Sequence, residues 1–289
     1  MLPFRLYTKE MSILSRQLIA FDMDGTLLNS RKEVSEKTLQ AIRKAYKAGK
    51  VLVFNSGRGM AEMTDYFELL PEFRYALCCS GTLIYDIWEK RVVSCRPIPR
   101  KYMEIMIRDI LPPEDTMPQL ATPELVWLAR KNFSQLDRYF MGHFRASFER
   151  FMTPVESVTE TYLSGTEECL KFNIYHSTVE ARERTLERLA ALRLPLALTR
   201  SEVTSVEVTA GGADKGSGIL KLCNLLGMSR ESTIAVGDAE NDLPALKAAG
   251  LGVAMGNARG VVLEAADETV ADCDHDGCAE AIERFLLDD

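Results

Sequence analysis

The sequence lacks any long hydrophobic run, although 46% of its 289 residues are apolar. A membrane-spanning helix needs ~20 consecutive apolar residues, and no segment approaches that length. Residues 1–17 carry scattered charges and no sustained apolar centre, so we do not expect a secretory signal there, and Met11 could be an alternative start. The sequence therefore predicts no membrane partner.

The chain also lacks blocks of Lys or Arg. Its 35 basic and 42 acidic residues give a formal charge of −7. Binding to nucleic acid or to an anionic membrane surface usually requires a concentrated basic patch, so neither partner is expected. An acidic protein that handles anions must instead gather positive charge locally.

The seven cysteines contain no C-x-x-C pair, and their number is odd. This pattern favours free thiols in a reducing compartment, and we expect a cytoplasmic protein. Cys273, His275 and Cys278 lie close together in sequence, but zinc sites need closer-set pairs and more ligands. Buried or surface thiols are the simpler interpretation.

Apolar strands alternate with amphipathic helices at both ends of the chain, which is typical of a parallel α/β sheet. In the first part, the expected strands are separated by helices from Ser35 to Gly49 and from Met60 to Leu70. The expected strands there are Leu18–Asp22, Val51–Phe54 and Tyr75–Cys79. After Asp214 the same rhythm returns, with strands at Thr233–Val236 and Gly252–Met255 and helices at Lys215–Leu226, Leu243–Ala249 and Cys278–Leu287.

The middle of the chain departs from this rhythm. Two short strands, Leu83–Asp86 and Arg91–Ser94, can pair as a hairpin, and proline-marked segments follow. Further on we expect strands at Cys169–Tyr175 and Val203–Val208 around a helix at Val179–Leu192. We therefore predict a Rossmann-like α/β core in two pieces, residues 12–84 and 207–289, interrupted by an inserted α/β domain at 85–206.

Polar residues gather where the predicted core strands end. In an open parallel sheet, ligands bind beyond the carboxyl ends of the strands, so these residues are expected to face one crevice. They are Asp22 and Asp24 after the first strand, Asn55, Ser56 and Gly57 after the second, Ser80, Gly81 and Thr82 after the third, and Gly237, Asp238, Asn241 and Asp242 after the strand that begins at Thr233.

Carboxylates that converge on one point need a cation or raised pKa values. Oxygen ligands of this kind suit Mg²⁺, which takes one or two carboxylates together with water and phosphate. A calcium loop is the alternative, with Glu33 at the twelfth position from Asp22, but Leu27 stands where that loop requires glycine. Magnesium is therefore the expected ion.

Lys215 can supply positive charge at this crevice. With Asp214 as the N-cap, Lys215 occupies the first turn of a helix, where the macrodipole disfavours a cation unless an anion binds nearby. Ser56 and Gly57 combine a hydroxyl with backbone amides at a strand end, which suits a phosphoryl group. A solvated lysine and an ordinary turn are the alternatives for these residues.

Taken together, these motifs resemble those of haloacid-dehalogenase-superfamily phosphatases, specifically the Cof-like group with an inserted α/β cap of type C2. Asp22 to Thr26 (DMDGT) resembles the first motif, Ser56 the second, Lys215 the third, and Gly237 to Asp242 (GDAEND) the fourth. The segments GVAMGNA and DHDGCAEAI resemble the closing part of that family. Ser80-Gly81-Thr82 stands where relatives commonly carry Asn-Gly-Ala, and Ser56 where many carry threonine.

This resemblance implies a Mg²⁺-dependent phosphatase of small phosphorylated metabolites, with sugar phosphates the expected class. Asp22 would be the nucleophile and Asp24 the acid and base, while Lys215, Ser56, Gly57 and Asn241 would bind the phosphoryl group. The metal would be held by Asp22, the backbone carbonyl of Asp24, and Asp238, with Asp242 behind them. Alternatives are a phosphomutase or phosphotransferase, or a silent binding protein, and we expect a monomer or weak homo-oligomer.

Overall fold

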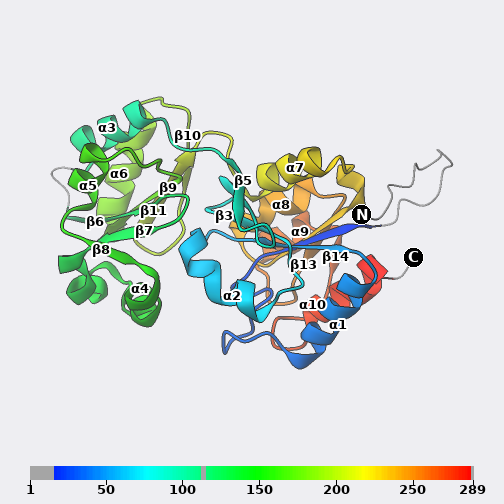
Figure 1. Ribbon diagram of the computed structural model, residues 1–289. Coiled ribbons are helices and arrows are strands. Elements are labelled where there is room, and N and C mark those ends of the chain that lie inside the picture. Colours follow the sequence, from blue (N-terminus) through cyan, green and yellow to red (C-terminus); the bar gives the residue numbers. More distant parts are fainter. Residues whose placement is uncertain (1–15, 112–114, 288–289) are drawn as a thin grey trace.

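The computed structural model describes residues 16–111 and 115–287, and its elements form two sheets with their covering helices (Figure 1). The predicted N-terminal lead-in up to Ser15, with Met11, and the prolines at 112 and 113 lie outside the described residues. The first sheet has eight strands in the order β14-β13-β12-β1-β2-β3-β4-β5, and the second has six in the order β10-β11-β9-β6-β7-β8.

The first sheet and its helices form the core unit. Its strands are β1 (Leu18–Phe21), β2 (Val51–Asn55), β3 (Tyr75–Cys78), β4 (Leu83–Asp86), β5 (Arg91–Cys95), β12 (Thr233–Gly237), β13 (Leu251–Ala254) and β14 (Glu268–Thr269). Its helices are α1 (Glu36–Lys47), α2 (Thr64–Leu69), α7 (Lys215–Leu226), α8 (Leu243–Ala248), α9 (Gly260–Ala265) and α10 (Gly277–Ala281). There are also 3₁₀ segments at Met60–Met63, Arg230–Ser232 and Glu240–Asp242, and α10 continues into a π-helix at Ile282–Leu287.

Both faces of the core sheet are buried. Because side chains alternate along a strand, β1 sends Ile19 and Phe21 into the cluster that contains α1 and α10 residues. Its Leu18 and Ala20 enter the opposite cluster with α7 and α8 residues. Strands β14 to β3 run parallel, so their carboxyl ends share one edge, and β4 and β5 add an antiparallel hairpin. This is the α/β fold that the sequence predicts.

The second sheet forms a separate layered unit, here called the second unit. Its strands are β6 (Thr116–Ala121), β7 (Val126–Ala129), β8 (Thr153–Val155), β9 (Lys171–His176), β10 (Leu196–Thr199) and β11 (Ser205–Ala210). Its helices are α3 (Arg100–Asp109), α4 (Arg145–Phe151), α5 (Val158–Ser164) and α6 (Val179–Ala191), with 3₁₀ segments at Arg130–Tyr139 and Gly142–Phe144. One sheet face packs on α3, α5 and α6 through an apolar cluster that includes Trp127 and Phe172.

The borders of the two sheets differ from the predicted domain borders at both ends. Residues 85–95, placed in the inserted domain, lie in β4 and β5 of the core sheet, because the hairpin extends β3 rather than starting a new sheet. Glu207, placed at the start of the second core piece, lies in β11, which pairs with β9 and β10. The return to the core unit comes with α7.

Proline did not prevent strand formation in the second unit. Pro118 lies within β6 opposite Ile174 of β9, while the pairing of β6 with β7 begins only at Gln119. A residue without a backbone N–H is tolerated where the strand has a partner on one side.

The helix predicted from Met60 to Leu70 is divided in the structure into a 3₁₀ turn and α2.

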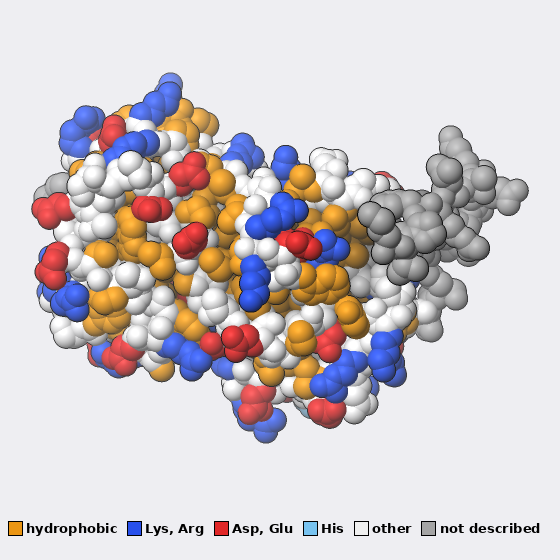
Figure 2. All heavy atoms as spheres, viewed as in Figure 1, with side chains coloured by type: hydrophobic (Ala, Val, Ile, Leu, Met, Phe, Trp, Pro, Cys, Tyr) orange, Lys and Arg blue, Asp and Glu red, His pale blue; other side chains and the backbone are white. Residues whose placement is uncertain are grey.

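On the face drawn in Figure 2, Lys and Arg side chains are scattered among acidic and apolar ones. None of the helices in residues 16–111 and 115–287 is both long and apolar enough to cross a membrane.

Candidate active site

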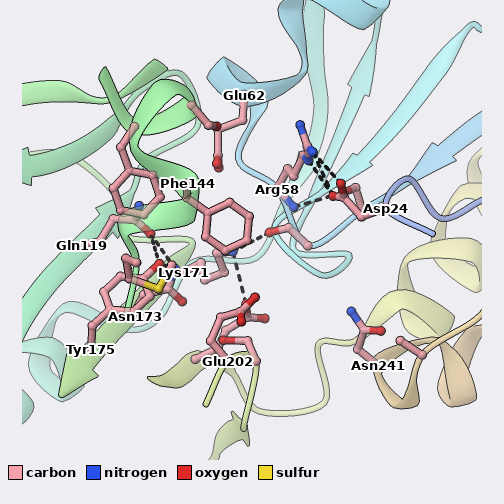
Figure 3. A pocket seen from close by; sticks show the side chains of 18 of the residues that line it. Asp24, Arg58, Glu62, Gln119, Phe144, Lys171, Asn173, Tyr175, Glu202 and Asn241 are labelled. Atoms are coloured by element: carbon pink, nitrogen blue, oxygen red, sulfur yellow. Dashed lines mark hydrogen bonds and ion pairs between the residues drawn. The ribbon is translucent and has the colours of Figure 1, made fainter. Parts of the chain in front are cut away.

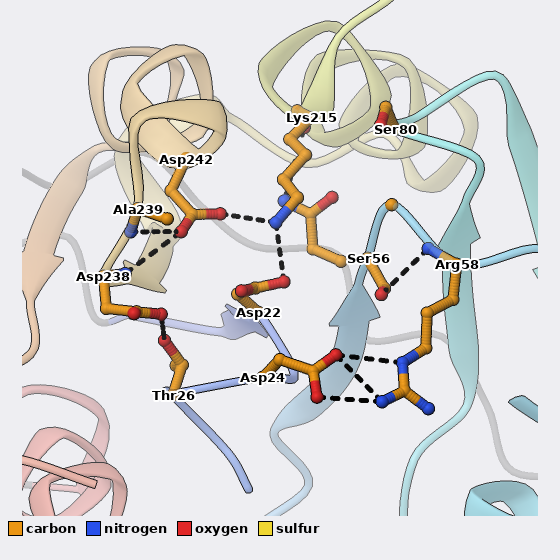
Figure 4. Close-up of polar contacts among 12 residues, drawn as sticks. Asp22, Asp24, Thr26, Ser56, Arg58, Ser80, Lys215, Asp238, Ala239 and Asp242 are labelled. Atoms are coloured by element: carbon orange, nitrogen blue, oxygen red, sulfur yellow. Dashed lines mark hydrogen bonds and ion pairs between the residues drawn. The ribbon is translucent and has the colours of Figure 1, made fainter. Parts of the chain in front are cut away.

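Asp22, Lys215 and Asp242 form a buried ion-pair cluster at the carboxyl edge of the core sheet (Figure 4). The Lys215 ammonium lies 2.6 Å from Oδ1 of Asp22 and 2.6 Å from Oδ1 of Asp242. Lys215 is 1% exposed and Asp22 is 7% exposed. Asp214 caps helix α7 as predicted, accepting from the Ser217 amide, and the two carboxylates offset the unfavourable position of Lys215 in the first turn.

The cluster carries more negative than positive charge. Burial, reinforced by the nearby Asp242 carboxylate, raises the pKa of Asp22 from 3.8 to about 7 despite the attraction of Lys215. Burial also raises the pKa of Asp238. Burial opposes the charge of Lys215, but the two carboxylates prevail and its pKa is raised, so the lysine remains a cation. One ammonium does not neutralise these acids.

Asp238 approaches Asp22 and Asp242 from the end of β12. Carboxylate oxygens of these three residues lie within 4.8 Å of one another, which makes them a candidate cation site. Thr26 donates to Oδ1 of Asp238 at 2.8 Å, and Asn257 donates to its Oδ2 at 3.3 Å. Gly25 has φ +80°, and a Cβ there would lie 2.6 Å from Oδ2 of Asp238, so glycine is required beside this oxygen.

Both carboxylate oxygens of Asp242 are already used by protein donors. Oδ1 accepts from Lys215, and Oδ2 accepts from the amides of Asp238 and Ala239, each at 3.0 Å. Asp242 therefore fixes the turn after β12 and the position of the Lys215 ammonium.

Asp24 lies beside the cluster, but its side chain turns toward two cations. Arg58 donates from Nε to Oδ2 at 3.0 Å and from Nη2 to Oδ1 at 2.9 Å, while Lys32 donates to Oδ1 at 2.7 Å. Burial raises the pKa of Asp24, but the charges and hydrogen bonds of Arg58 and Lys32 outweigh it, and the pKa is lowered overall. The acidic cluster that the structure forms contains Asp242 in place of the Asp24 side chain.

A cavity of about 430 Å³ lies between the core unit and the second unit (Figure 3). On the core side it is lined by the predicted residues Asp22, Asp24, Ser56, Gly57 and Asn241, together with Lys32, Arg58, Glu62 and Ala239. On the other side it is lined by Gln119, Met141, Phe144, Ser147, Phe148, Lys171, Asn173, Tyr175, Ser201, Glu202 and Glu207. Of the other predicted residues, Lys215 and Asp242 lie in the ion-pair cluster, and Asp238 lies beside that cluster.

The sequence interpretation missed the second-unit side of this cavity. In β9, Phe172 and Ile174 enter the apolar cluster, so the alternating Lys171, Asn173 and Tyr175 face the cavity. The pattern KFNIYH contains this alternation, which could have identified a polar strand face. Arg58, which directly follows Ser56-Gly57, was also missed.

The comparisons with known proteins show the family of the chain. The family model described as haloacid dehalogenase-like hydrolase matches residues 19–282. A Bacillus subtilis protein named 5-amino-6-(5-phospho-D-ribitylamino)uracil phosphatase is 30% identical, over 94% of this chain and 96% of its own. Pyridoxal phosphate phosphatase of Escherichia coli is 26% identical, over 95% of this chain and 100% of its own.

Solved structures give the same result. A haloacid dehalogenase-like hydrolase from Bacteroides thetaiotaomicron superposes with a TM-score of 0.80 at 29% identity, over 93% of this chain and 99% of its own. One from B. subtilis gives 0.81 at 26% identity, over 93% and 100%. Sequence, fold and relatives therefore agree that this chain belongs to the haloacid dehalogenase-like hydrolases, in their Cof-like group of phosphatases.

Proposed function

We propose that the chain hydrolyses phosphate monoesters of small metabolites, with Asp22 as the nucleophile. The observation that carries this proposal is the Lys215 ammonium shared between Asp22 and Asp242, directly beneath a cavity that Asp22 lines. Lys215 engages Oδ1 of Asp22, so the other oxygen is the one to attack. A lysine in this position offsets the negative charge of both the nucleophile and the incoming phosphoryl group.

In the first step, an Asp22 oxygen forms a bond to phosphorus while the bond from phosphorus to the leaving oxygen breaks. Asp24 gives a proton to that oxygen, so an alcohol leaves and an aspartyl-phosphate remains. In the second step, Asp24 takes a proton from water as the water oxygen attacks phosphorus. Asp22 leaves as a carboxylate, inorganic phosphate is released, and Asp24 keeps the proton taken from water, so it is again the acid that the first step requires.

Asp24 must exchange partners during this cycle. In the conformation described, Arg58 and Lys32 hold it as a carboxylate, which suits acceptance of a proton rather than donation. Protonation of Asp24 weakens both ion pairs and frees the carboxyl group to face the leaving oxygen. Ser56 and Gly57 from the core and Asn241 from the turn after β12 line the same cavity and are proposed to hold the phosphoryl oxygens.

The acidic cluster fits Mg²⁺. Three carboxylates lie within 4.8 Å of one another with Lys215 as the cation among them, and the hard oxygen donors are those that Mg²⁺ prefers. Asp22, Asp238 and the backbone carbonyl of Asp24 are proposed to hold the ion, with Asp242 orienting them. When bound, the ion supplies charge neutralisation for the transferring phosphoryl group.

This charge balance predicts an unusual pH dependence of stability. Because the pKa of Asp22 is raised from 3.8 to about 7, the folded chain binds a proton there that the unfolded chain has already lost. Without metal, the free energy of unfolding should therefore be higher at pH 6 than at pH 8. Urea titrations in chelator should show this difference, which shrinks with Mg²⁺ and in Asp22→Asn. An equal pH difference in wild type and Asp22→Asn would contradict the prediction.

The side chains that line the cavity indicate the chemical class of the leaving group. Its second-unit wall combines apolar side chains, Met141, Phe144 and Phe148, with polar ones from β6 and β9. The second unit is proposed to act as a cap that selects the leaving group, because the core residues are occupied with the phosphoryl group. Sugar phosphates remain the proposed class, and the apolar wall also admits ring-bearing metabolites such as those in the names of the relatives.

The test is a screen of phosphorylated metabolites and p-nitrophenyl phosphate with purified protein. We expect release of inorganic phosphate in Mg²⁺ and a loss of at least ~100-fold in turnover after chelation. An isomeric phosphorylated product, or transfer to an added alcohol, would identify a phosphomutase or phosphotransferase instead. Absence of any turnover with Mg²⁺ binding retained would identify a binding protein.

A further inference from the structure

The segment Ser56–Arg58 is held by hydrogen bonds to three successive backbone carbonyls. The core loop after β3 supplies two of the donors, and the second unit supplies the middle one. The Ser80 amide donates to the Ser56 carbonyl at 3.0 Å, the Lys171 ammonium donates to the Gly57 carbonyl at 2.5 Å, and the Cys79 amide donates to the Arg58 carbonyl at 2.8 Å. A charged side chain of β9 therefore completes the anchoring of a core loop.

Lys171 is itself fixed by a buried network. It is 7% exposed, and its ammonium lies 3.2 Å from Oε2 of Glu207 on the neighbouring strand β11. Oε1 of Glu207 accepts from the Ser80 hydroxyl at 2.6 Å, so the network returns to the core unit (Figure 3 shows the contacts of Lys171). A buried ammonium with a carboxylate and a carbonyl as acceptors has little freedom to move.

The Gly57 carbonyl belongs to the same planar peptide as the Arg58 N–H. Fixing the carbonyl on one side therefore fixes the direction of the N–H on the other. That N–H donates to Oγ of Ser56 at 3.2 Å. Because Oγ of Ser56 accepts this hydrogen bond, the direction of the Ser56 hydroxyl proton is restricted. The Arg58 side chain, which pairs with Asp24, likewise extends from a fixed backbone.

From this geometry we infer that Lys171 is a positioning residue for catalysis. Resting on the proposed function, Lys171 orients the Gly57–Arg58 peptide and thereby both the Ser56 hydroxyl and the Arg58–Asp24 pair. The second unit thus contributes to the phosphoryl-transfer site itself, in addition to selecting the leaving group. Glu207 pairs with Lys171 and also accepts from the Ser80 hydroxyl, so these contacts join the second unit to the core loops after β2 and β3.

A different role would give a different pattern of kinetics. Lys171 also lines the cavity, so it could instead contact the leaving group directly. In that case, replacing Lys171 would raise KM for some substrates and leave it nearly unchanged for others. A residue that acts through the Gly57–Arg58 peptide should lower kcat by a similar factor for every leaving group, since each substrate presents the same phosphoryl group.

The experiment compares Lys171→Met with the double variant Lys171→Met/Glu207→Met. The single change leaves Glu207 buried without its cation and should lower the melting temperature, whereas the double change removes both charges and should restore it. We expect kcat to fall about 10- to 100-fold in both variants, on phenyl phosphate and on a sugar phosphate alike. Lys44→Met, in an exposed pair with Glu283, is the matched control and should leave kcat unchanged.

Inorganic phosphate binding in Mg²⁺, measured by calorimetry, supplies a readout that needs no turnover. Both Lys171 variants should bind phosphate more weakly than wild type. Wild-type values of kcat and of phosphate affinity in the double variant would overturn the inference. A loss of kcat that differs from one leaving group to another would overturn it as well. Failure of the proposed function would be seen separately, as a wild-type protein that binds phosphate but releases none from monoesters.

Discussion

Replacing Asp22 by Asn is expected to lower kcat by at least about 1,000-fold while the protein stays folded. The amide keeps the shape of the carboxylate but cannot attack phosphorus, so the first bond of the reaction is not formed. Lys215 retains Asp242 as its partner at 2.6 Å. The substitution also removes a carboxyl group whose ionised form is disfavoured by burial. We therefore expect a melting temperature at least equal to that of wild type.

The measurement is steady-state turnover of p-nitrophenyl phosphate, with thermal melts of both proteins in chelator. Thr38→Ser provides a control for a conservative change at a buried polar residue of the core unit away from the cavity. Turnover of Asp22→Asn within tenfold of wild type would remove Asp22 from the role of nucleophile.

Replacing Lys215 by Met is expected to have the largest effect on stability. Asp22 and Asp242 would remain buried without their shared cation, and breaking a buried ion pair from one side typically costs ~3–5 kcal/mol of unfolding free energy. The loss should be smaller at pH 6 than at pH 8, because protonation of Asp22 relieves the repulsion. Turnover should fall as well, since the phosphoryl group loses its fixed cation.

Urea titrations at the two pH values measure this effect. The matched control is Lys221→Met, which lies on the same helix α7 at an exposed position and should change the unfolding free energy by less than ~0.5 kcal/mol. A Lys215→Met protein as stable as this control would contradict the assignment of Lys215 as the counterion of the cluster.

The core side of the site could be predicted because the position of its side chains follows from the ends of the parallel strands. Asp22, Ser56 and Asp238 each come directly after a strand of a parallel sheet, and parallel strands end at a common edge. Lys215 was predictable from its place in the first turn after Asp214. Local sequence and one rule of topology pointed to these residues, and the family resemblance implied their roles.

The second-unit side could not be predicted in the same way. Lys171 and Glu207 acquire their importance from contacts with Gly57 and Ser80, more than 100 residues away in sequence. No local sequence pattern predicts which face of a buried strand contacts the core unit. The borders of the two sheets differ from the predicted domain borders for a related reason. A hairpin can extend the sheet before it or begin another sheet, and long-range strand pairing decides between the two.

The most direct test of Asp22 as the nucleophile is to trap the phosphoryl group on the protein. Asp24→Asn should still accept phosphorus from p-nitrophenyl phosphate, whose leaving group needs little protonation, but should hydrolyse the intermediate slowly. Acid quenching in Mg²⁺ followed by peptide mass spectrometry should then find one phosphoryl group on the peptide that contains Asp22, and none when Asp22 is also replaced by Asn. A phosphoryl group on another residue, or continuing turnover with the Asp22 carboxylate never modified, would contradict this role of Asp22.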